Sequence, residues 1–330
     1  MIDGHSHIWT DSFKKIDAHS HIWTDSFWME APIEEYIKQA TNIWIEKAFI
    51  MPVPSPITIE NNENILPCRW DEQDWEIRYF KKKLIKWQYE IIEENPKNPY
   101  KYLNEILIEK LKNNSNKSLE FYSVWLIHPK LDRLDYIKEL CNNKNIYAVK
   151  IHGVWTFTWP DDVPDDFFKI IKDSWKPLVV HVDYHNKKPE NFFDELLLLN
   201  NPVDWVKKWI KHGIKLYITH AAKFSKEAVE LAKWNENIVF WMSPDLLIPQ
   251  DINGIYSKED NAIRWCLEKI PNKQLVFDID YSWNAKEIWN WGELEWNSSN
   301  RITYEAKKIW ISNNELKNIF YNNSIRYFNI

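Results

Sequence analysis

Short apolar runs rich in β-branched and aromatic residues alternate along the chain with segments in which apolar residues recur every three or four positions. The first pattern is typical of buried strands and the second of amphipathic helices. Helical spacing is clearest in Asp165–Asp173, Val203–Lys211, Ser225–Lys233 and Lys258–Lys269. Strand spacing marks eight segments: Lys15–Ile22, Ile45–Val53, Leu119–Ile127, Ile146–His152, Pro177–Asp183, Lys215–His220, Asn237–Met242 and Gln274–Asp280. Eight strands alternating with helices predict an α/β fold, a parallel sheet closed into one (β/α)8 TIM barrel.

One stretch departs from this alternation. Between the second and third predicted strands, residues 55–117 form a long excursion, in which Gln73–Glu94 and Pro99–Lys112 have helical spacing. We expect a helical insertion that either packs on the flank of the barrel or covers its mouth. Near the end of the chain, Ser312 and Glu315 have the spacing of a capping box, which predicts a last helix running towards Tyr327.

The N-terminus contains a direct repeat. The segment IDGHSHIWTDSF at residues 2–13 recurs as IDAHSHIWTDSF at residues 16–27. We expect the second copy to form the first strand, because the distance from His21 through a loop and a predicted helix, Pro32–Ala40, to the next strand is that of an ordinary βα unit. Residues 1–14 would then be a duplicated tail, and residues 15–330 a single barrel domain.

Composition narrows the class of protein. Hydrophobic residues make up 45% and charged residues 27% of the chain, the balance of a globular protein. The net charge of −6 comes without a basic stripe, which argues against a nucleic-acid partner. The three cysteines are far apart, and neither a signal peptide nor a membrane-spanning run is visible. We expect a cytoplasmic protein that acts on a small molecule without a membrane partner; homo-oligomerisation stays open.

Glycine and tryptophan are used abnormally. The chain has 5 Gly and 21 Trp, where average usage predicts about 23 Gly. Several tryptophans stand where glycine is the physical choice, as Trp175 does between a predicted helix and a strand. Trp23, Trp125 and Trp241 look similar. Our hypothesis is that the gene comes from a genome that reads UGA as glycine and was translated here with tryptophan; the alternative is a protein that is rich in tryptophan.

Polar residues at the ends of the predicted strands are the candidates for chemistry, because the active sites of TIM barrels lie at the carboxyl ends of the strands. His19 and His21 are alternate residues at the end of the first strand, and His181, His220 and Asp280 end the fifth, sixth and eighth. Buried imidazoles and a carboxylate at one end of a barrel are costly to desolvate without a cation or a full hydrogen-bond network. Nitrogen and oxygen ligands without thiolate suit Zn, Mn or Fe.

These residues, together with AVKIHG, PLVVH, THAA and VFDIDY, give the chain a resemblance to the amidohydrolase superfamily of metal-dependent hydrolases, in the branch that also contains nonoxidative decarboxylases. The resemblance extends over almost the whole chain. It implies that His19, His21, His181 and Asp280 bind one divalent metal, with Zn first and Mn or Fe as alternatives. It also implies catalytic roles for Asp280, as the base, and for His220, beside the metal-bound water.

Some assignments stay open. Asp278 shares a strand face with Asp280 and is the alternative ligand. Lys150 and His152 are possible additional site residues, since a carboxylated lysine bridges two metals in some members of the superfamily. His128 could line the site or have a capping or core role.

The reaction stays open as well. Hydrolysis of an amide, lactone or ester is the first expectation, and decarboxylation of a small carboxylic acid is the close alternative. The rival class is a non-catalytic barrel that binds a ligand.

Overall fold

The protein is described here by a computed structural model that covers residues 14–21, 23–26, 29–31, 33–52, 57–59, 63–70, 77–82, 89–91, 97–113, 119–153, 156, 158–182, 200–242, 259–279 and 291–330. Its main sheet has eight strands, and each neighbouring pair is parallel. In spatial order they are β1 (Lys15–His21), β4 (Ile45–Met51), β9 (Glu120–Leu126), β10 (Ile146–His152), β11 (Leu178–His181), β12 (Leu216–Ile218), β13 (Ile238–Met242) and β14 (Leu275–Phe277). All eight predicted strands are confirmed.

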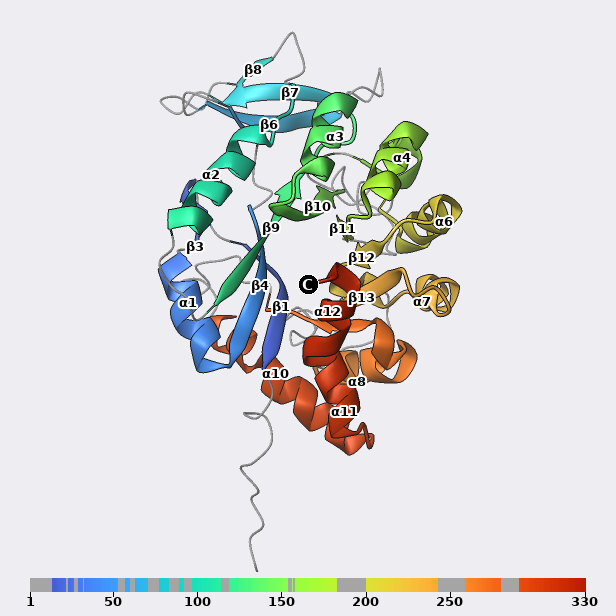
Figure 1. The fold of residues 1–330 in the computed structure, drawn as a ribbon. Helices are drawn as coiled ribbons and strands as arrows, with labels where there is room; N and C mark the ends of the chain where they lie inside the picture. The colour runs from blue at the N-terminus through green and yellow to red at the C-terminus, as the bar shows by residue number, and fades with distance from the viewer. Residues whose placement is uncertain are drawn as a thin grey trace, which may run out of the picture.

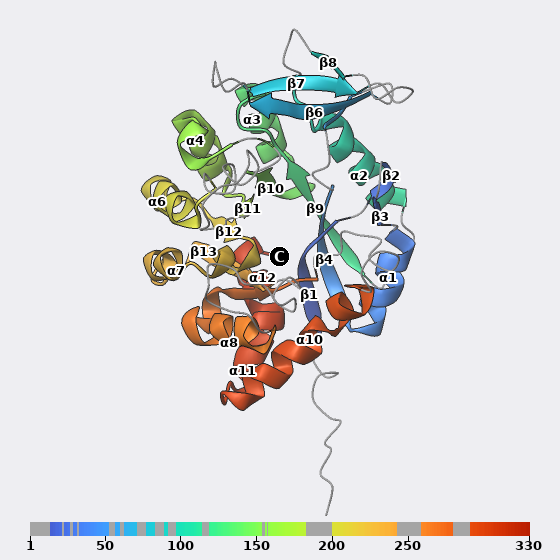
Figure 2. The same cartoon turned by 180° about the vertical axis from the view of Figure 1, so that it is seen from behind.

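The sheet curls until its last strand lies beside its first. Figures 1 and 2 show the strands surrounding a common centre, with helices on the outside. The backbone N–H of Ile279, just after β14, donates a hydrogen bond to Asp17 Oδ1 in β1 at 3.0 Å. The architecture is therefore a TIM-barrel-like α/β fold. The outer helices are α1 (Ile33–Asn42), α2 (Lys101–Asn113), α3 (Leu134–Asn142), α4 (Asp165–Ser174), α6 (Pro202–His212), α7 (Lys226–Ala232), α8 (Glu259–Lys269) and α10 (Trp291–Lys308).

Local sequence fixes where several of these helices begin. Asn201 caps α6 by accepting a hydrogen bond from Val203 N, and Ser225 caps α7 by accepting one from Ala228 N. Ser312 and Glu315 form the predicted capping box. It opens α11 (Asn313–Lys317), which continues through a π-helical turn, η5 (Asn318–Asn322), into α12 (Asn323–Phe328).

The core has two layers. The larger one lies between the strands and the helix ring. The smaller one fills the inside of the barrel and includes Phe49, Tyr122, Val179, Tyr217, Trp241, Tyr327 and Phe328.

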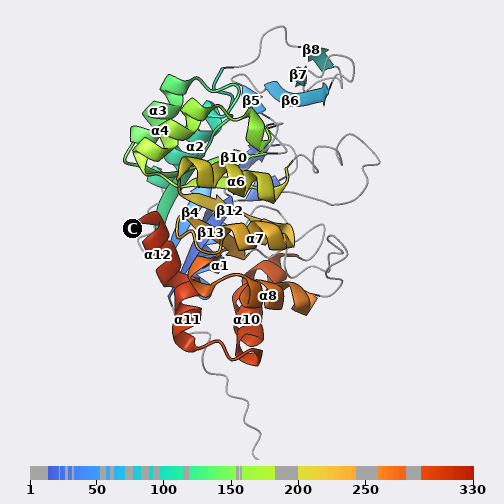
Figure 3. The same ribbon diagram turned by 90° about the vertical axis from the view of Figure 1, so that its right-hand side faces the viewer.

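The C-terminal helix closes the amino-terminal end of the barrel. The ring of Phe328 stacks on that of Phe49, with centroids 3.8 Å apart, and Lys215, just before β12, donates from Nζ to the backbone oxygen of Tyr327 at 2.9 Å. In Figure 1 the C-terminus lies near the centre of the barrel, and Figure 3 shows α12 at one end of it. The opposite end of the barrel, at the carboxyl ends of the strands, is the end at which TIM-barrel enzymes have their active sites.

The expectation of a helical insertion was wrong in its first half. The stretch Gln73–Glu94 contains the strands β7 (Ile77–Lys82) and β8 (Tyr89–Ile91), which join β5 (Ile57–Ile59) and β6 (Glu63–Trp70) in a four-stranded antiparallel sheet. Isoleucine, tyrosine and phenylalanine favour strands once antiparallel partners are present, and this overrides helical spacing. The segment Pro99–Lys112 is helical as expected, because α2 covers most of it, but α2 is one of the outer helices of the barrel, so the helical insertion itself is not confirmed.

Figure 1 shows this sheet at the rim of the barrel, on the side opposite α8 and α10. A small hairpin, β2 (Trp23–Ser26) with β3 (Met29–Ala31), follows β1. Residues 1–13 lie outside the described residues, so the predicted tail stays a prediction. None of the helices among the described residues is both long and apolar enough to cross a membrane.

Candidate active site

Three histidines meet at the carboxyl ends of three neighbouring strands. His152 is the last residue of β10 and His181 the last of β11, and the two are directly paired in the parallel register. Their rings stack with centroids 3.8 Å apart and an angle of 14° between planes. His220 follows β12 and brings its Nε2 to 3.2 Å from His181 Nδ1. The parallel register therefore places these imidazoles in one cluster, as their positions at strand ends predicted.

A left-handed turn sets the position of His220. After β12 the chain enters η2 (His220–Phe224), in which all five residues have positive φ, between 46° and 60°. The backbone before the turn is held by Thr219, whose N–H donates to Val180 O at 3.2 Å and whose Oγ1 accepts from Val182 N at 3.0 Å. These bonds extend the contact between β11 and β12 past the end of the regular strands.

The surroundings of His181 keep its ring neutral. Burial lowers its pKa well below the usual 6.5, and the neighbouring His152 and His220 lower it further. The ammonium groups of Lys150 and Lys223 act in the same direction. Both lysines are buried, Lys150 fully so. A neutral imidazole is the form that can bind a metal ion.

Trp241, in β13, forms one wall of the cluster. Its ring stacks on that of His220 with centroids 5.1 Å apart, and it is fully buried. On the other side, the chain leaves β10 through Gly153, where a Cβ would stand 1.8 Å from Asn200 Oδ1. Only glycine fits there without a shift of its neighbour.

The remaining predicted ligands are placed only in part. His19 and His21 lie in β1, so the second copy of the repeat supplies this strand, but their side chains lie outside the described residues, as does Asp280. Asp278, the alternative ligand, is fully buried just after β14. Within the described part of the chain, no group of three His, Cys, Asp or Glu side chains is arranged to hold a metal ion. The four-ligand metal site stays a prediction.

His128, which was expected to line the site or to have a capping or core role, accepts a hydrogen bond at its Nδ1 from Lys130 N at 3.3 Å, a local contact of the capping kind. It is fully buried after β9, and its backbone N–H donates to Asp132 Oδ2 at 2.7 Å. Burial lowers the pKa of the His128 ring to about 3 and raises the pKa of the Asp132 carboxyl to about 7. The sequence did not single out Asp132 or Lys223, because neither stands at the end of a strand pattern.

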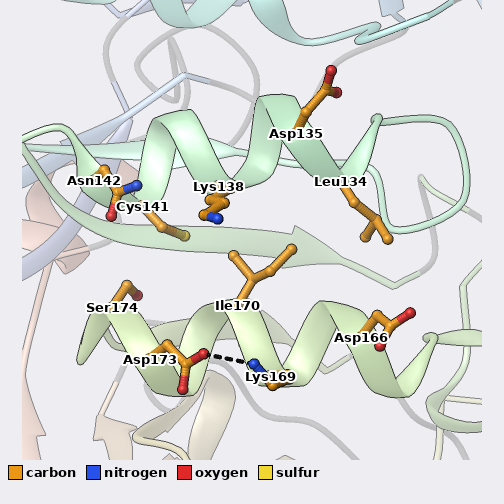
Figure 4. Close-up of a pocket in the computed structure, with 10 residues that line it drawn as sticks. All are labelled: Leu134, Asp135, Lys138, Cys141, Asn142, Asp166, Lys169, Ile170, Asp173 and Ser174. Carbon is orange, nitrogen blue, oxygen red and sulfur yellow. Dashed lines mark hydrogen bonds and ion pairs between the residues drawn. The ribbon is translucent and has the colours of Figure 1, made fainter.

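A separate cavity of about 340 Å³ lies between α3 and α4, on the outside of the barrel (Figure 4). Its side chains of both charges include Lys169 and Asp173, which form an ion pair at 3.1 Å. Cys141 contributes the one thiol in its lining, and burial raises the pKa of that thiol to about 11, which makes it a poor nucleophile. The Cys141 thiol therefore gives this cavity no reactive nucleophile near neutral pH.

Comparison with known proteins agrees with this architecture. No protein-family model and no curated protein matches the chain. Among solved structures, an amidohydrolase II aligns at 12% identity over 96% of this chain and 100% of its own, with a TM-score of 0.56. A putative 2-pyrone-4,6-dicarboxylic acid hydrolase from Pseudomonas putida aligns at 11% identity over 96% and 98%, with a TM-score of 0.55. The IDCase of Metarhizium anisopliae aligns at 11% over 97% and 98%, with a TM-score of 0.53. The chain therefore has the fold of amidohydrolase structures, as its resemblance to that superfamily predicted.

Proposed function

We propose that this protein is a metal-dependent enzyme of the amidohydrolase type that hydrolyses an amide, lactone or ester bond in a small molecule. The observation that carries the proposal is the convergence of His152, His181 and His220 at the carboxyl ends of adjacent barrel strands. The same end of the fold holds the active site in TIM-barrel enzymes. The neighbours of known fold include a putative hydrolase, which supports the same class of activity.

The chemistry of the proposed donor set, imidazoles and a carboxylate without thiolate, suits a divalent metal, with Zn first and Mn or Fe as alternatives. His19, His21, His181 and Asp280 would hold it. When bound, such an ion lowers the pKa of its water ligand to about 7, which supplies hydroxide as a nucleophile near neutral pH. Among the described residues His181 supports this assignment, because it is an imidazole at the carboxyl end of β11 whose lowered pKa favours the neutral form that a metal requires.

The 3.2 Å contact between His181 Nδ1 and His220 Nε2 requires one ring to donate and the other to accept, and we assign the donor role to His181. A neutral His181 that donates from Nδ1 keeps the lone pair of its Nε2 for the metal. His220 then accepts at Nε2 and carries its own proton on Nδ1. His220 can use this Nδ1–H to stabilise a developing oxyanion, while Asp280 takes the proton of the attacking water and delivers it to the leaving group.

One observation favours the second candidate, decarboxylation of a small carboxylic acid. The buried side chains of Lys150 and Lys223 lie close enough to the cluster to lower the pKa of His181, and protonated lysines there would give the site a positive potential. A carboxylate substrate would be attracted to such a site. His152, stacked on His181, would then contact the substrate from the β10 side.

The experiment is metal removal and restoration. The protein is treated with chelator, reloaded with Zn, Mn or Fe, and assayed at each stage against esters, lactones, amides and carboxylic acids. Turnover that is lost and then restored supports the proposal, and the substrate that turns over distinguishes hydrolase from decarboxylase. Binding of a ligand without turnover in every metal state would favour the non-catalytic barrel.

A pair of variants locates the site. His181→Ala should lower metal content and turnover by at least 100-fold. The matched control is His212→Ala in α6, on the outer ring, where the ring contacts Asp165 at 3.2 Å. If both variants keep metal and activity, the strand-end cluster is not the active site.

A further inference from the structure

Three tryptophans share an unusual backbone conformation with a glycine. Gly213, which ends α6, has a φ of 63°, and Trp44, Trp175 and Trp310 have φ of 67°, 60° and 65°. Each of the four follows a helix and precedes the next element. Left-handed φ at this place is the ordinary role of glycine, because a Cβ is strained there.

The hydrogen bonds at these four positions are also alike. The N–H of Trp44 donates to Thr41 O, that of Trp175 to Lys172 O, and that of Trp310 to Lys307 O, at 3.1 to 3.2 Å. The N–H of Gly213 donates to Ile210 O at 3.2 Å, which is the same step of three residues.

At Trp310 a second hydrogen bond completes a known helix-ending motif. The following residue, Ile311, donates to Ala306 O at 3.0 Å, and the two bonds together form the Schellman motif that commonly ends helices at glycine.

The side chains of the three tryptophans do not explain their presence. Trp44, Trp175 and Trp310 are 55%, 80% and 92% exposed, although tryptophan is among the most hydrophobic residues. A strained backbone is normally retained when packing of the side chain compensates for it. At these three positions most of the indole lies in solvent.

We infer that the natural protein has glycine at positions 44, 175 and 310, because its genome reads UGA as glycine and the printed sequence reads it as tryptophan. The low glycine count of 5 and the high tryptophan count of 21 are what translating UGA as tryptophan instead of glycine would produce. The inference holds whichever reaction the barrel catalyses.

Burial and position inside a helix identify two other tryptophans that the natural protein retains. Trp205 and Trp209 lie inside α6, are fully buried and contact each other edge to face, with centroids 4.8 Å apart. Glycine in a helix interior weakens the helix, and losing two indoles would leave a large void in the core. We infer that both positions are encoded as tryptophan.

The direct test is peptide mass spectrometry of the protein purified from its source cells. Glycine at positions 44, 175 and 310, with tryptophan at 205 and 209, is the expected result. Tryptophan at any of the first three positions, or glycine at either of the last two, overturns the inference.

A second test uses recombinant protein with the printed sequence. The triple variant Trp44→Gly/Trp175→Gly/Trp310→Gly should melt about 4 °C higher, because left-handed strain is removed at three positions. The matched control is Trp234→Gly, since Trp234 is 83% exposed but is not among the residues with positive φ. Its melting temperature should not rise. A triple variant that melts at or below the parent, or a control that gains as much per substitution, contradicts the geometric argument.

Discussion

The backbone N–H of Ile279 donates to Asp17 Oδ1 across 262 positions of sequence. The other carboxylate oxygen, Oδ2, accepts from Ser20 Oγ and from Tyr36 Oη, both at 2.5 Å. One fully buried side chain therefore ties the first strand of the barrel to the end of the last and to α1. Because the three donors are buried together, the acceptor is required for all of them at once.

Replacing Asp17 with alanine should lower the free energy of unfolding by roughly 3 kcal/mol or more, since three donors lose their acceptor. Tyr36→Phe, which removes one donor and keeps the acceptor, should lose about 1 kcal/mol. Exposed Asp161→Ala is the control and should stay within about 0.5 kcal/mol of the parent. Urea denaturation measures all three. Equal losses for Asp17→Ala and Asp161→Ala would show that this closure does not stabilise the barrel.

The eight barrel strands could be predicted because each is buried between the barrel interior and the ring of helices, and a strand buried on both faces is a short apolar run in the sequence. For example, β11 lies within the predicted segment Pro177–Asp183. The antiparallel sheet of β5 to β8 could not be predicted in the same way. Its strands are stabilised by pairing with one another, and helical spacing in the sequence concealed this.

The candidate site, like the fold, could be predicted from the sequence only in part. The meeting of His152, His181 and His220 follows from their places at strand ends, which sequence spacing reveals. The left-handed turn of η2 does not follow, because alanine at positions 221 and 222 carries no preference for positive φ. Tertiary contacts, and not local propensity, set that turn.

The pair of His128 and Asp132 predicts an unusual pH dependence. The Asp132 carboxyl has its pKa raised by burial from 3.8 to about 7, so its contribution to stability is complete below pH 3.8 and is lost as pH rises towards 7. His128 has its pKa lowered by burial from 6.5 to about 3, so its contribution is complete above pH 6.5 and is lost as pH falls towards 3. Between about pH 4 and 6.5 the two effects oppose each other.

Asp132→Asn removes one of these effects. Its stability relative to the parent should rise by roughly 2–4 kcal/mol between pH 4 and pH 7, and change little outside that window. Urea midpoints at pH 4, 5.5 and 7 measure the trend. A difference between variant and parent that is the same at all three values would mean that Asp132 ionises in the native protein with an ordinary pKa.

Trp241 in β13 should be structurally important to the chain as printed. It is fully buried and stacks on His220 at 5.1 Å. Trp241→Ala should lower the free energy of unfolding by about 3–5 kcal/mol, because a large core side chain is replaced by a cavity. Exposed Trp234→Ala, measured by the same denaturation, should change it by about 0.5 kcal/mol at most. Similar small losses in both variants would mean that the wall beside His220 can collapse around the missing ring.

Three opposing effects decide how glycine substitutions would change the stability of the turn that carries His220. Ala221 and Ala222 have φ of 48° and 54° and are fully buried. Changing either to glycine relieves about 1–2 kcal/mol of left-handed strain. It also loses about 0.8 kcal/mol of methyl burial and adds about 0.4–1 kcal/mol of unfolded-state entropy. The three contributions nearly cancel, so each variant should stay within about 0.5 kcal/mol of the parent.

Ala228→Gly in α7 is the matched control, because Ala228 is as buried but lies in a right-handed helix. That variant has no strain to relieve and should lose about 1–2 kcal/mol. Denaturation of the three single variants under one condition makes the comparison. If Ala221→Gly and Ala222→Gly lose as much as Ala228→Gly, the turn is not strained, and the position of His220 then depends on the hydrogen bonds of Thr219 rather than on a strained backbone held in place by the surrounding core.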